Sequence, residues 1–132
     1  DLVRVTVVSG EDSVRVVGTL IGRRNRPHLL EAWEQRFDVQ LEDHVTLLHY
    51  RDVPGMIGRV GTVFGARGIN IISAAVGRHA EESSDASAHG ERERAAHTLA
   101  VMAITTDAVV PQAVIEEILA LDGFAAGRTV SL

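Results

Sequence analysis

The residues best suited to chemistry lie in one stretch, from His49 to Ile71, which reads HYRDVPGMIGRVGTVFGARGINI. Asp52 comes just before an expected helix start, where the backbone amides of Met56 and Ile57 have no partners inside the helix. A carboxylate beside unpaired amide donors can hold both charged groups of a zwitterion. Asn70, which we expect at the same end of the sheet, adds an amide that donates and accepts hydrogen bonds. This pattern predicts a binding site for an amino acid and not a catalytic centre.

Each of these residues also has a simpler interpretation. Asp52 can cap the helix, Asn70 can satisfy a turn, and Tyr50 can be no more than an aromatic residue at the end of a strand. Pro54 has the backbone angle of a first-turn residue, and a glycine follows it. The residues alone leave these interpretations open, and the candidates for a ligand-binding site are Tyr50, Asp52, Pro54, Gly55, Met56, Ile57 and Asn70.

Three glycines, Gly55, Gly58 and Gly61, recur at every third position of the expected helix and leave one side of it without bulk. Glycine weakens a helix, so its use here suggests close approach by a ligand or by a second backbone. The row is not a dinucleotide-binding fingerprint, because the pattern Gly-x-Gly-x-x-Gly is absent.

We find no catalytic or metal-binding arrangement in the sequence. Ser13, Ser73 and Ser131 have no nearby base and no nucleophile elbow. His44 and His49 have opposite parity on one expected strand, so they face opposite sides and cannot share a metal ion. The fragment itself is therefore predicted to be non-catalytic, with no metal and no cofactor of its own.

Composition narrows the class of protein. The chain has 132 residues, of which 45% are hydrophobic, and this suffices for one core or two small ones. The net charge of -5 argues against a nucleic-acid partner, and the lack of a long apolar run argues against a membrane. The absence of cysteine fits the cytoplasm, which is our predicted location. Because the chain starts with Asp1 in strand-like alternation, we infer that it is a piece of a longer polypeptide.

Alternation of apolar and polar residues predicts strands in the first third of the chain. The runs 2–8 and 14–21 are separated by a turn cluster and predict a β-hairpin. A basic connector at 22–27 follows, and residues 36–41 form another expected strand. We interpret residues 1–43 as the last part of a β-rich domain whose front half is missing.

Strands and helices alternate in the remaining residues, 44–132. Helical spacing predicts helices at 55–67 and 111–121, and extended runs predict strands at 45–50, 69–76, 97–105 and 124–132. The order βαββαβ predicts an α+β, ferredoxin-like domain with a four-stranded antiparallel sheet and both helices on one side. We expect the run 69–76 at the centre of this sheet. Residues 77–96 are polar and predict a flexible hairpin loop.

Residues 44–132 resemble an ACT domain, the amino-acid-sensing module of many metabolic enzymes. The resemblance rests on the turn Asp52-Val53-Pro54-Gly55, on the helix glycines Gly58 and Gly61, and on the strand opening Gly68-Ile69-Asn70-Ile71. With the strands before it, the whole chain is similar to the C-terminal regulatory region of the long-form D-3-phosphoglycerate dehydrogenases. In that family an intervening, allosteric substrate-binding domain precedes the ACT domain, and residues 1–43 resemble its end.

The resemblance implies feedback inhibition in serine biosynthesis. L-serine would bind between two ACT domains of a homodimer or higher homo-oligomer, with Tyr50 and Asp52 from one chain and Asn70 from the other. It implies a parent oxidoreductase that uses NAD, although the fragment holds none. Two alternatives stay open: an ACT domain that serves oligomerisation alone, and the regulatory tail of an L-serine dehydratase. A further anion site of the intervening domain would draw on Arg23, Arg24, Arg26 and Arg36.

Overall fold

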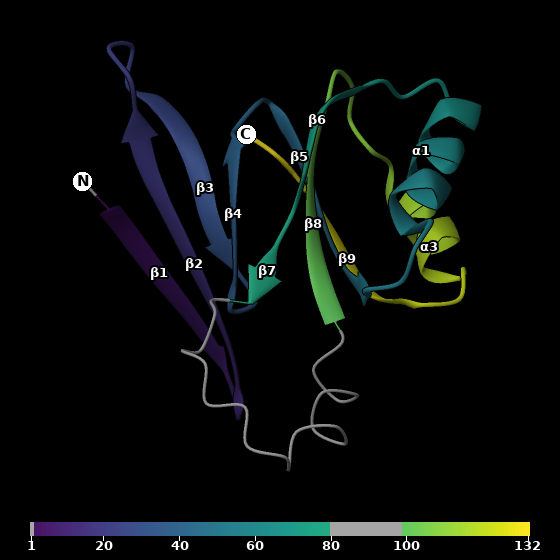
Figure 1. Cartoon of the computed structure of the whole chain (residues 1–132), viewed down its shortest axis with the longest axis horizontal. Coiled ribbons are helices and arrows are strands. Elements are labelled where there is room, and N and C mark those ends of the chain that lie inside the picture. The colour runs from purple at the N-terminus through teal and green to yellow at the C-terminus, as the bar shows by residue number, and fades with distance from the viewer. Residues whose placement is uncertain (1, 80–98) are drawn as a thin grey trace.

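The computed structural model describes residues 2–79 and 99–132. These residues form three layers: one antiparallel sheet lies against a second antiparallel sheet, and two helices cover the far face of the second (Figure 1). The first sheet is built almost entirely from residues before His44, and the second from residues after it.

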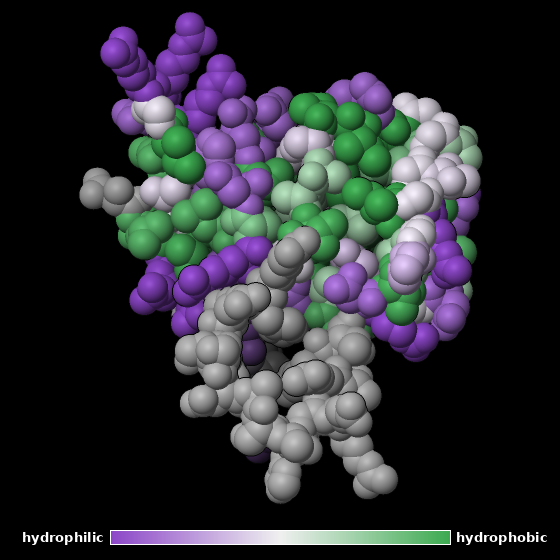
Figure 2. All heavy atoms as spheres, in the orientation of Figure 1, coloured by the Kyte–Doolittle hydropathy of each residue, from purple (hydrophilic) through white to green (hydrophobic). Residues whose placement is uncertain are grey.

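The first sheet has the strand order β1-β2-β3-β4-β7. The hairpin predicted for its first two strands is confirmed. The basic connector predicted at 22–27 is shorter: residues 22–25 form the exposed turn between β2 and β3, the hydrophilic tip in Figure 2, and Arg26 and Pro27 belong to β3. On the face toward the second sheet, Leu29 and Val39 pack against Ala103. The strands are β1 (Leu2–Ser9), β2 (Asp12–Ile21), β3 (Arg26–Ala32), β4 (Gln35–Gln40) and β7 (Arg78–His79).

The second sheet has the order β6-β8-β5-β9, so that β8 and β5 lie at its centre. The prediction that residues 69–76 occupy the centre is wrong, because β6 is an edge strand that pairs only with β8 among the described residues. Ile72 and Val76 of β6 are exposed, as expected for an edge strand with one covered face. The strands are β5 (His44–Arg51), β6 (Ile71–Val76), β8 (Leu99–Thr106) and β9 (Phe124–Ser131).

Two helices, α1 (Met56–Ala66) and α3 (Gln112–Leu119), cover the second sheet on the side away from the first (Figure 1). They bury one face each, including Val60 and Ile115, in a core with Leu48 of the sheet. The predicted α+β ferredoxin-like fold, βαββαβ with a four-stranded antiparallel sheet, is confirmed. In the part of the chain that the structure describes, no helix is long and apolar enough to cross a membrane.

Gln35 connects the two sheets through its buried side-chain amide. Its Nε2 donates a hydrogen bond to the backbone carbonyl of Leu99, and its Oε1 accepts one from the backbone amide of Val101 at 2.7 Å. Since β6 ends at Val76, the Gln35 amide takes the place that a peptide group of a longer β6 would have beside β8. It thereby satisfies two backbone groups at the junction of the sheets.

After β6 the chain leaves the second sheet and joins the first. Gly77 is buried, its amide donates to the Val101 carbonyl at 2.6 Å, and β7 then pairs with β4. A Cβ at Gly77 would lie only 3.0 Å from the Cβ of Gln35, so the crossing has no room for a side chain. The predicted flexible loop is therefore wrong for residues 77–79, and its remainder lies outside the described residues.

The turn between β3 and β4 has an unusual backbone. Ala32 pairs with Gln35, so Trp33 and Glu34 form a two-residue turn, and both have positive φ angles, 47° and 62°. Such a pair of angles is typical of a type I′ turn, which favours Asn-Gly, and a non-glycine residue held there costs on the order of 1–3 kcal/mol. The turn stacks the indole of Trp33 on the imidazole of His49, with ring centroids 5.3 Å apart and an interplanar angle of 10°.

Candidate functional site

The predicted effector turn lies where β5 ends and α1 begins. Asp52 is exposed, and the backbone folds tightly around it, because the Val53 amide donates to the Arg51 carbonyl at 2.9 Å. The Arg51 amide in turn donates to the Gly123 carbonyl at 2.7 Å. Gly55, with φ of 90°, is the N-cap of α1, and the helix has no side-chain cap hydrogen bond. Asp52 is therefore not the helix cap; it precedes the N-cap Gly55 in an exposed turn, and the helix start has no side-chain cap.

The two amides predicted to bind a carboxylate open the helix. Met56 and Ile57 are its first residues, so their N–H groups have no acceptor within the helix. The Met56 side chain is buried against Gly123, whereas the Ile57 side chain is 49% exposed. Pro54 is exposed and lies before the helix rather than in its first turn. Met56 thus anchors the turn in the core, and Asp52 stays at the surface.

Tyr50, like Met56, has a buried side chain. It belongs to the core between the second sheet and the helices, and its ring centroid lies 6.0 Å from that of Phe124. Burial raises the pKa of the Tyr50 phenol, and the negative charge of Asp52 raises this pKa further. Tyr50 therefore supports the turn from the core side, and its ring faces the core instead of open solvent.

Asn70 is exposed just before β6, and Asp107 holds its backbone in place. The backbone amide of Asn70 donates to the Asp107 carboxylate at 3.0 Å, and the backbone amide of Asp107 donates to the backbone carbonyl of Asn70 at 3.1 Å. The side-chain amide of Asn70 makes no hydrogen bond to any described residue. Its position is therefore fixed while its amide group stays available to a ligand or to another chain.

The expectation that Asp52 and Asn70 share one end of the sheet is wrong. β5 and β6 are both antiparallel to β8, so they run parallel to each other. β5 ends opposite Leu99, whereas β6 begins opposite Thr106. At about 3.4 Å per residue along β8, these two ends are roughly 24 Å apart. Within one chain, Asp52 and Asn70 cannot hold the same small amino acid.

The glycine row on α1 faces open space. A Cβ placed at Gly58, Gly61 or Gly65 would meet no atom within 4 Å, apart from the neighbouring helix backbone. Gly55 is different, because its φ of 90° is a left-handed backbone angle that favours glycine. Packing within the described chain therefore does not account for the helical glycines, and nothing in it makes the predicted close approach to them.

The four arginines predicted for an anion site do not converge. Arg23 and Arg24 lie in the β2–β3 turn, and Arg26 begins β3. Arg36 pairs across the sheet with Glu31, near the other end of β3, which places its backbone about 17 Å from that of Arg26. All four arginines are exposed. Arg23, Arg24 and Arg26 lie together at one end of β3 and Arg36 lies near the other end, so they do not form one pocket.

Comparison with known proteins identifies the second half of the chain. The family model of the ACT domain matches residues 44–123. The chain belongs to the ACT domain family. This match starts at the first residue of β5 and includes both helices, so the second sheet is called the ACT sheet below.

Curated proteins that are similar to this chain include D-3-phosphoglycerate dehydrogenases. The chain is 30% identical to that of Archaeoglobus fulgidus over 131 residues, which is 99% of this chain and 22% of the relative. It is 32% identical to that of Methanocaldococcus jannaschii over 116 residues, 88% of this chain and 19% of the relative. It is 33% identical to that of Mycobacterium tuberculosis over 81 residues, 61% of this chain and 15% of the relative. The chain therefore spans between 15% and 22% of the length of these relatives and is homologous to their regulatory regions.

Sequence reasoning missed the residues where the first sheet meets the ACT sheet. Trp33 lies in a run too short to assign, and Gln35 has the polar, strand-flanking character of an exposed residue. The structure buries Gln35 between the sheets and stacks Trp33 on His49 of β5. One signal was available, since Trp33 is the single tryptophan of the chain and is followed by a charged turn residue.

Proposed function

We propose that this ACT domain is part of the regulatory region of a D-3-phosphoglycerate dehydrogenase and that it binds L-serine as an inhibitory effector. The observation that carries the proposal is the uncapped start of α1 beside the exposed carboxylate of Asp52. The relatives support it, because they are D-3-phosphoglycerate dehydrogenases that match this chain over up to 99% of its residues. In this proposal NAD and the substrate that the enzyme oxidises bind to parts of the enzyme outside these residues.

The turn offers one partner for each charged group of an amino acid. The carboxylate of Asp52 accepts hydrogen bonds from the ligand's ammonium group. The amides of Met56 and Ile57 donate to the ligand's carboxylate at the positive end of the helix dipole. The ligand's side chain then points away from the turn, where a hydroxyl group needs a further polar partner.

A second copy of the chain supplies that partner through Asn70. β6 is an edge strand, so two copies can join through antiparallel β6 edges around a two-fold axis. In this pairing the second copy's strand runs in the opposite direction, and its Asn70 comes to the end of the sheet where Asp52 of the first copy lies. The separation of the two residues within one chain is then what the shared site requires.

The surface beside β6 supports such a pairing. Ile72 and Val76 of the edge strand are 52% and 43% exposed. The open side of α1 carries Gly58 and Gly65, which leave room for another backbone or a ligand. Burying apolar residues of this kind contributes about 25 cal/mol per Å² of apolar area removed from water, which favours association.

Isothermal titration calorimetry with L-serine tests the proposal. We expect saturable binding with one ligand per chain and much weaker binding of D-serine, whose groups cannot reach the same partners. Asp52→Asn and Asn70→Ala should each weaken L-serine binding about tenfold or more, which corresponds to roughly 1.4 kcal/mol. The matched control is Asp122→Asn, since Asp122 is an exposed carboxylate in a neighbouring turn and should not affect binding.

Mixing the two variants tests whether the site is shared between copies. A mixed dimer of Asp52→Asn and Asn70→Ala chains has one site with both wild-type residues and one site with neither. Random mixing should therefore restore L-serine binding to roughly a quarter of the wild-type sites. No restoration on mixing would place both residues at separate sites and refute the shared pocket. Sedimentation that shows a dimer, with no binding of L-serine, would leave assembly as the domain's role.

A further inference from the structure

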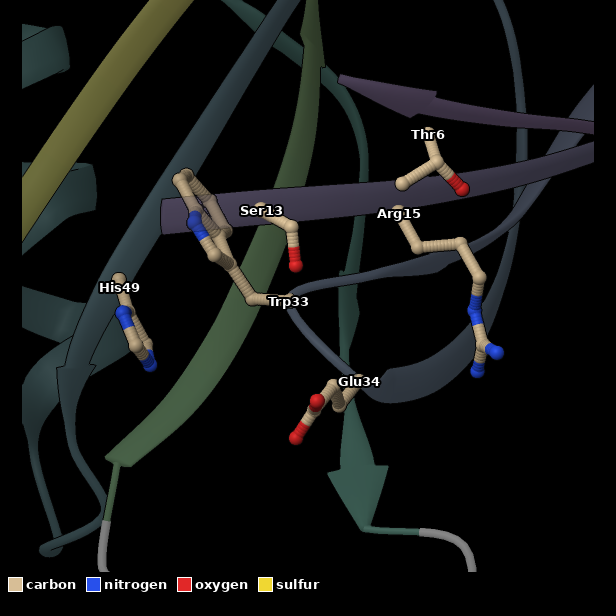
Figure 3. Close-up of a pocket in the computed structure, with 6 residues that line it drawn as sticks. All are labelled: Thr6, Ser13, Arg15, Trp33, Glu34 and His49. Atoms are coloured by element: carbon tan, nitrogen blue, oxygen red, sulfur yellow. The ribbon is translucent and has the colours of Figure 1, made fainter. Parts of the chain in front are cut away.

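A cavity of about 550 Å³ lies where the first sheet meets the ACT sheet, and none of the residues of the effector turn lines it. It falls in the size range of pockets for small molecules. Figure 3 shows Arg15 on one side, Trp33 and His49 on the other, and Glu34 at the rim between them. The described residues that line it come from the β1–β2 hairpin, the β3–β4 turn and β5, and they are Thr6, Ser13, Arg15, Trp33, Glu34 and His49.

One wall of the cavity carries a fixed guanidinium group. Arg15 donates from Nε and Nη2 to one carboxylate oxygen of Glu31, at 2.8 Å and 2.5 Å. The Glu31 side chain is 10% exposed and the Arg15 side chain 46%, so the buried carboxylate holds the arginine while part of the guanidinium faces solvent. A guanidinium has five N–H donors, and the donors that Glu31 does not use are available to a ligand.

A flat aromatic surface, the indole of Trp33, lies opposite Arg15, and the carboxylate of Glu34 lies at the rim between them. The strained β3–β4 turn presents both groups, since its two central residues, Trp33 and Glu34, have positive φ. Glu34 is exposed and forms no ion pair with Arg15 or with any other described residue. Two bulky residues occupy a turn type that favours Asn-Gly, and the side chains of both line this cavity, which points to a role for those side chains.

The geometry points to a second ligand site that takes an α-amino acid with an aromatic side chain. The ligand's carboxylate binds Arg15, its ammonium binds Glu34, and its ring packs on the indole of Trp33. A phosphate or other dianion is disfavoured because Glu31 already pairs with Arg15 and Glu34 repels negative charge. A simple amine would leave the donors of Arg15 unused. Only a zwitterion has a charged partner for both Arg15 and Glu34.

This site would join the first sheet to the ACT sheet. Five of its lining residues belong to the first sheet and its turns, and His49 belongs to β5. β5 leads directly into the turn that holds Asp52. A ligand in the cavity would therefore contact, through His49, the strand that ends at the proposed effector site. The two sites remain chemically independent, because they share no residue.

Trp33 reports binding at this site directly, because it is the single tryptophan of the chain. We expect L-phenylalanine to change the fluorescence of Trp33 saturably, and L-serine and inorganic phosphate to change it little. Arg15→Met and Glu34→Gln should each weaken L-phenylalanine binding about tenfold. The matched control is Arg4→Met, which removes an exposed arginine from β1 that does not line the cavity, and it should bind as the wild type does.

A substitution at the strained turn separates binding from folding. Glu34→Gly removes the ligand's ammonium partner and relieves a positive φ angle at an exposed position. We expect this variant to unfold at a higher temperature than the wild type and yet to lose the response to L-phenylalanine. Loss of binding together with higher stability cannot be attributed to misfolding.

The two proposed sites can fail separately. Asp52→Asn should weaken L-serine binding about tenfold or more and leave the Trp33 response to L-phenylalanine unchanged. The inference is overturned if L-phenylalanine gives no saturable response in the wild type, or if Arg15→Met and Glu34→Gln bind it as tightly as Arg4→Met. A response to inorganic phosphate that Arg15→Met removes, with none to L-phenylalanine, would identify an anion site instead and also overturn it.

Discussion

Replacing Gln35 with methionine tests how the two sheets are joined. Methionine has a similar length and is apolar, so the substitution removes both hydrogen bonds and leaves little empty volume. The Leu99 carbonyl and the Val101 amide then lose their side-chain partner at a buried position. Each buried polar group left unpaired costs about 1–3 kcal/mol, so the free energy of unfolding should fall by about 2–6 kcal/mol.

Urea unfolding followed by circular dichroism measures this change. The midpoint for Gln35→Met should shift to lower urea concentration with an unchanged slope, because the folded and unfolded surfaces stay similar. The matched control is Arg36→Met, the exposed neighbour on β4, which should change the unfolding free energy by less than about 0.5 kcal/mol. An equally small change for Gln35→Met would refute the conclusion that the amide satisfies buried backbone groups of β8.

Three further predictions concern glycine packing and pH. Gly127→Ala should lower the free energy of unfolding by about 1–3 kcal/mol, because its Cβ would lie 3.0 Å from side-chain atoms of Ile115 and Leu48. Gly58→Ala and Gly65→Ala should each raise it by about 0.5–1 kcal/mol in the monomer, since their sites on α1 are open; a decrease would show an unseen contact. Because the pKa of Tyr50 is raised in the folded protein, its contribution to stability is fully present below the ordinary tyrosine value of 10.0 and should be lost as pH rises through the folded pKa. Absorbance of the phenolate follows this titration, because Tyr50 is the single tyrosine, and the alkaline loss of stability should be smaller in Tyr50→Phe.

The order of strands and helices in the ACT domain could be predicted because it depends on local patterns. Apolar residues at helical spacing and a glycine with φ of 70° at Gly68 mark α1 and its end. The lateral position of β6 could not be predicted in the same way, since an apolar run reports burial of a strand's faces and not which strands lie beside it. One face of an edge strand can be as apolar as that of a central strand.

The relation between Asp52 and Asn70 shows a different limit. Both residues flank α1 in the sequence, which suggested that they meet, but a helix between two parallel strands carries the chain back to the opposite end of the sheet. The contacts of Gln35 and Trp33 were out of reach for another reason. Gln35 binds strand β8, more than sixty positions further along the chain, and local periodicity carries no information about such partners.

The crossing of β7 from one sheet to the other limits how this ACT domain can be moved between proteins. A cut before His44 would take β7 away from β4 and leave Gln35 behind, so that Leu99 and Val101 would lose their partner. It would also uncover the apolar face of the ACT sheet around Ala103. Gene fusion or domain shuffling that transplants residues 44–132 alone would therefore need a replacement amide for β8 and polar substitutions on that face.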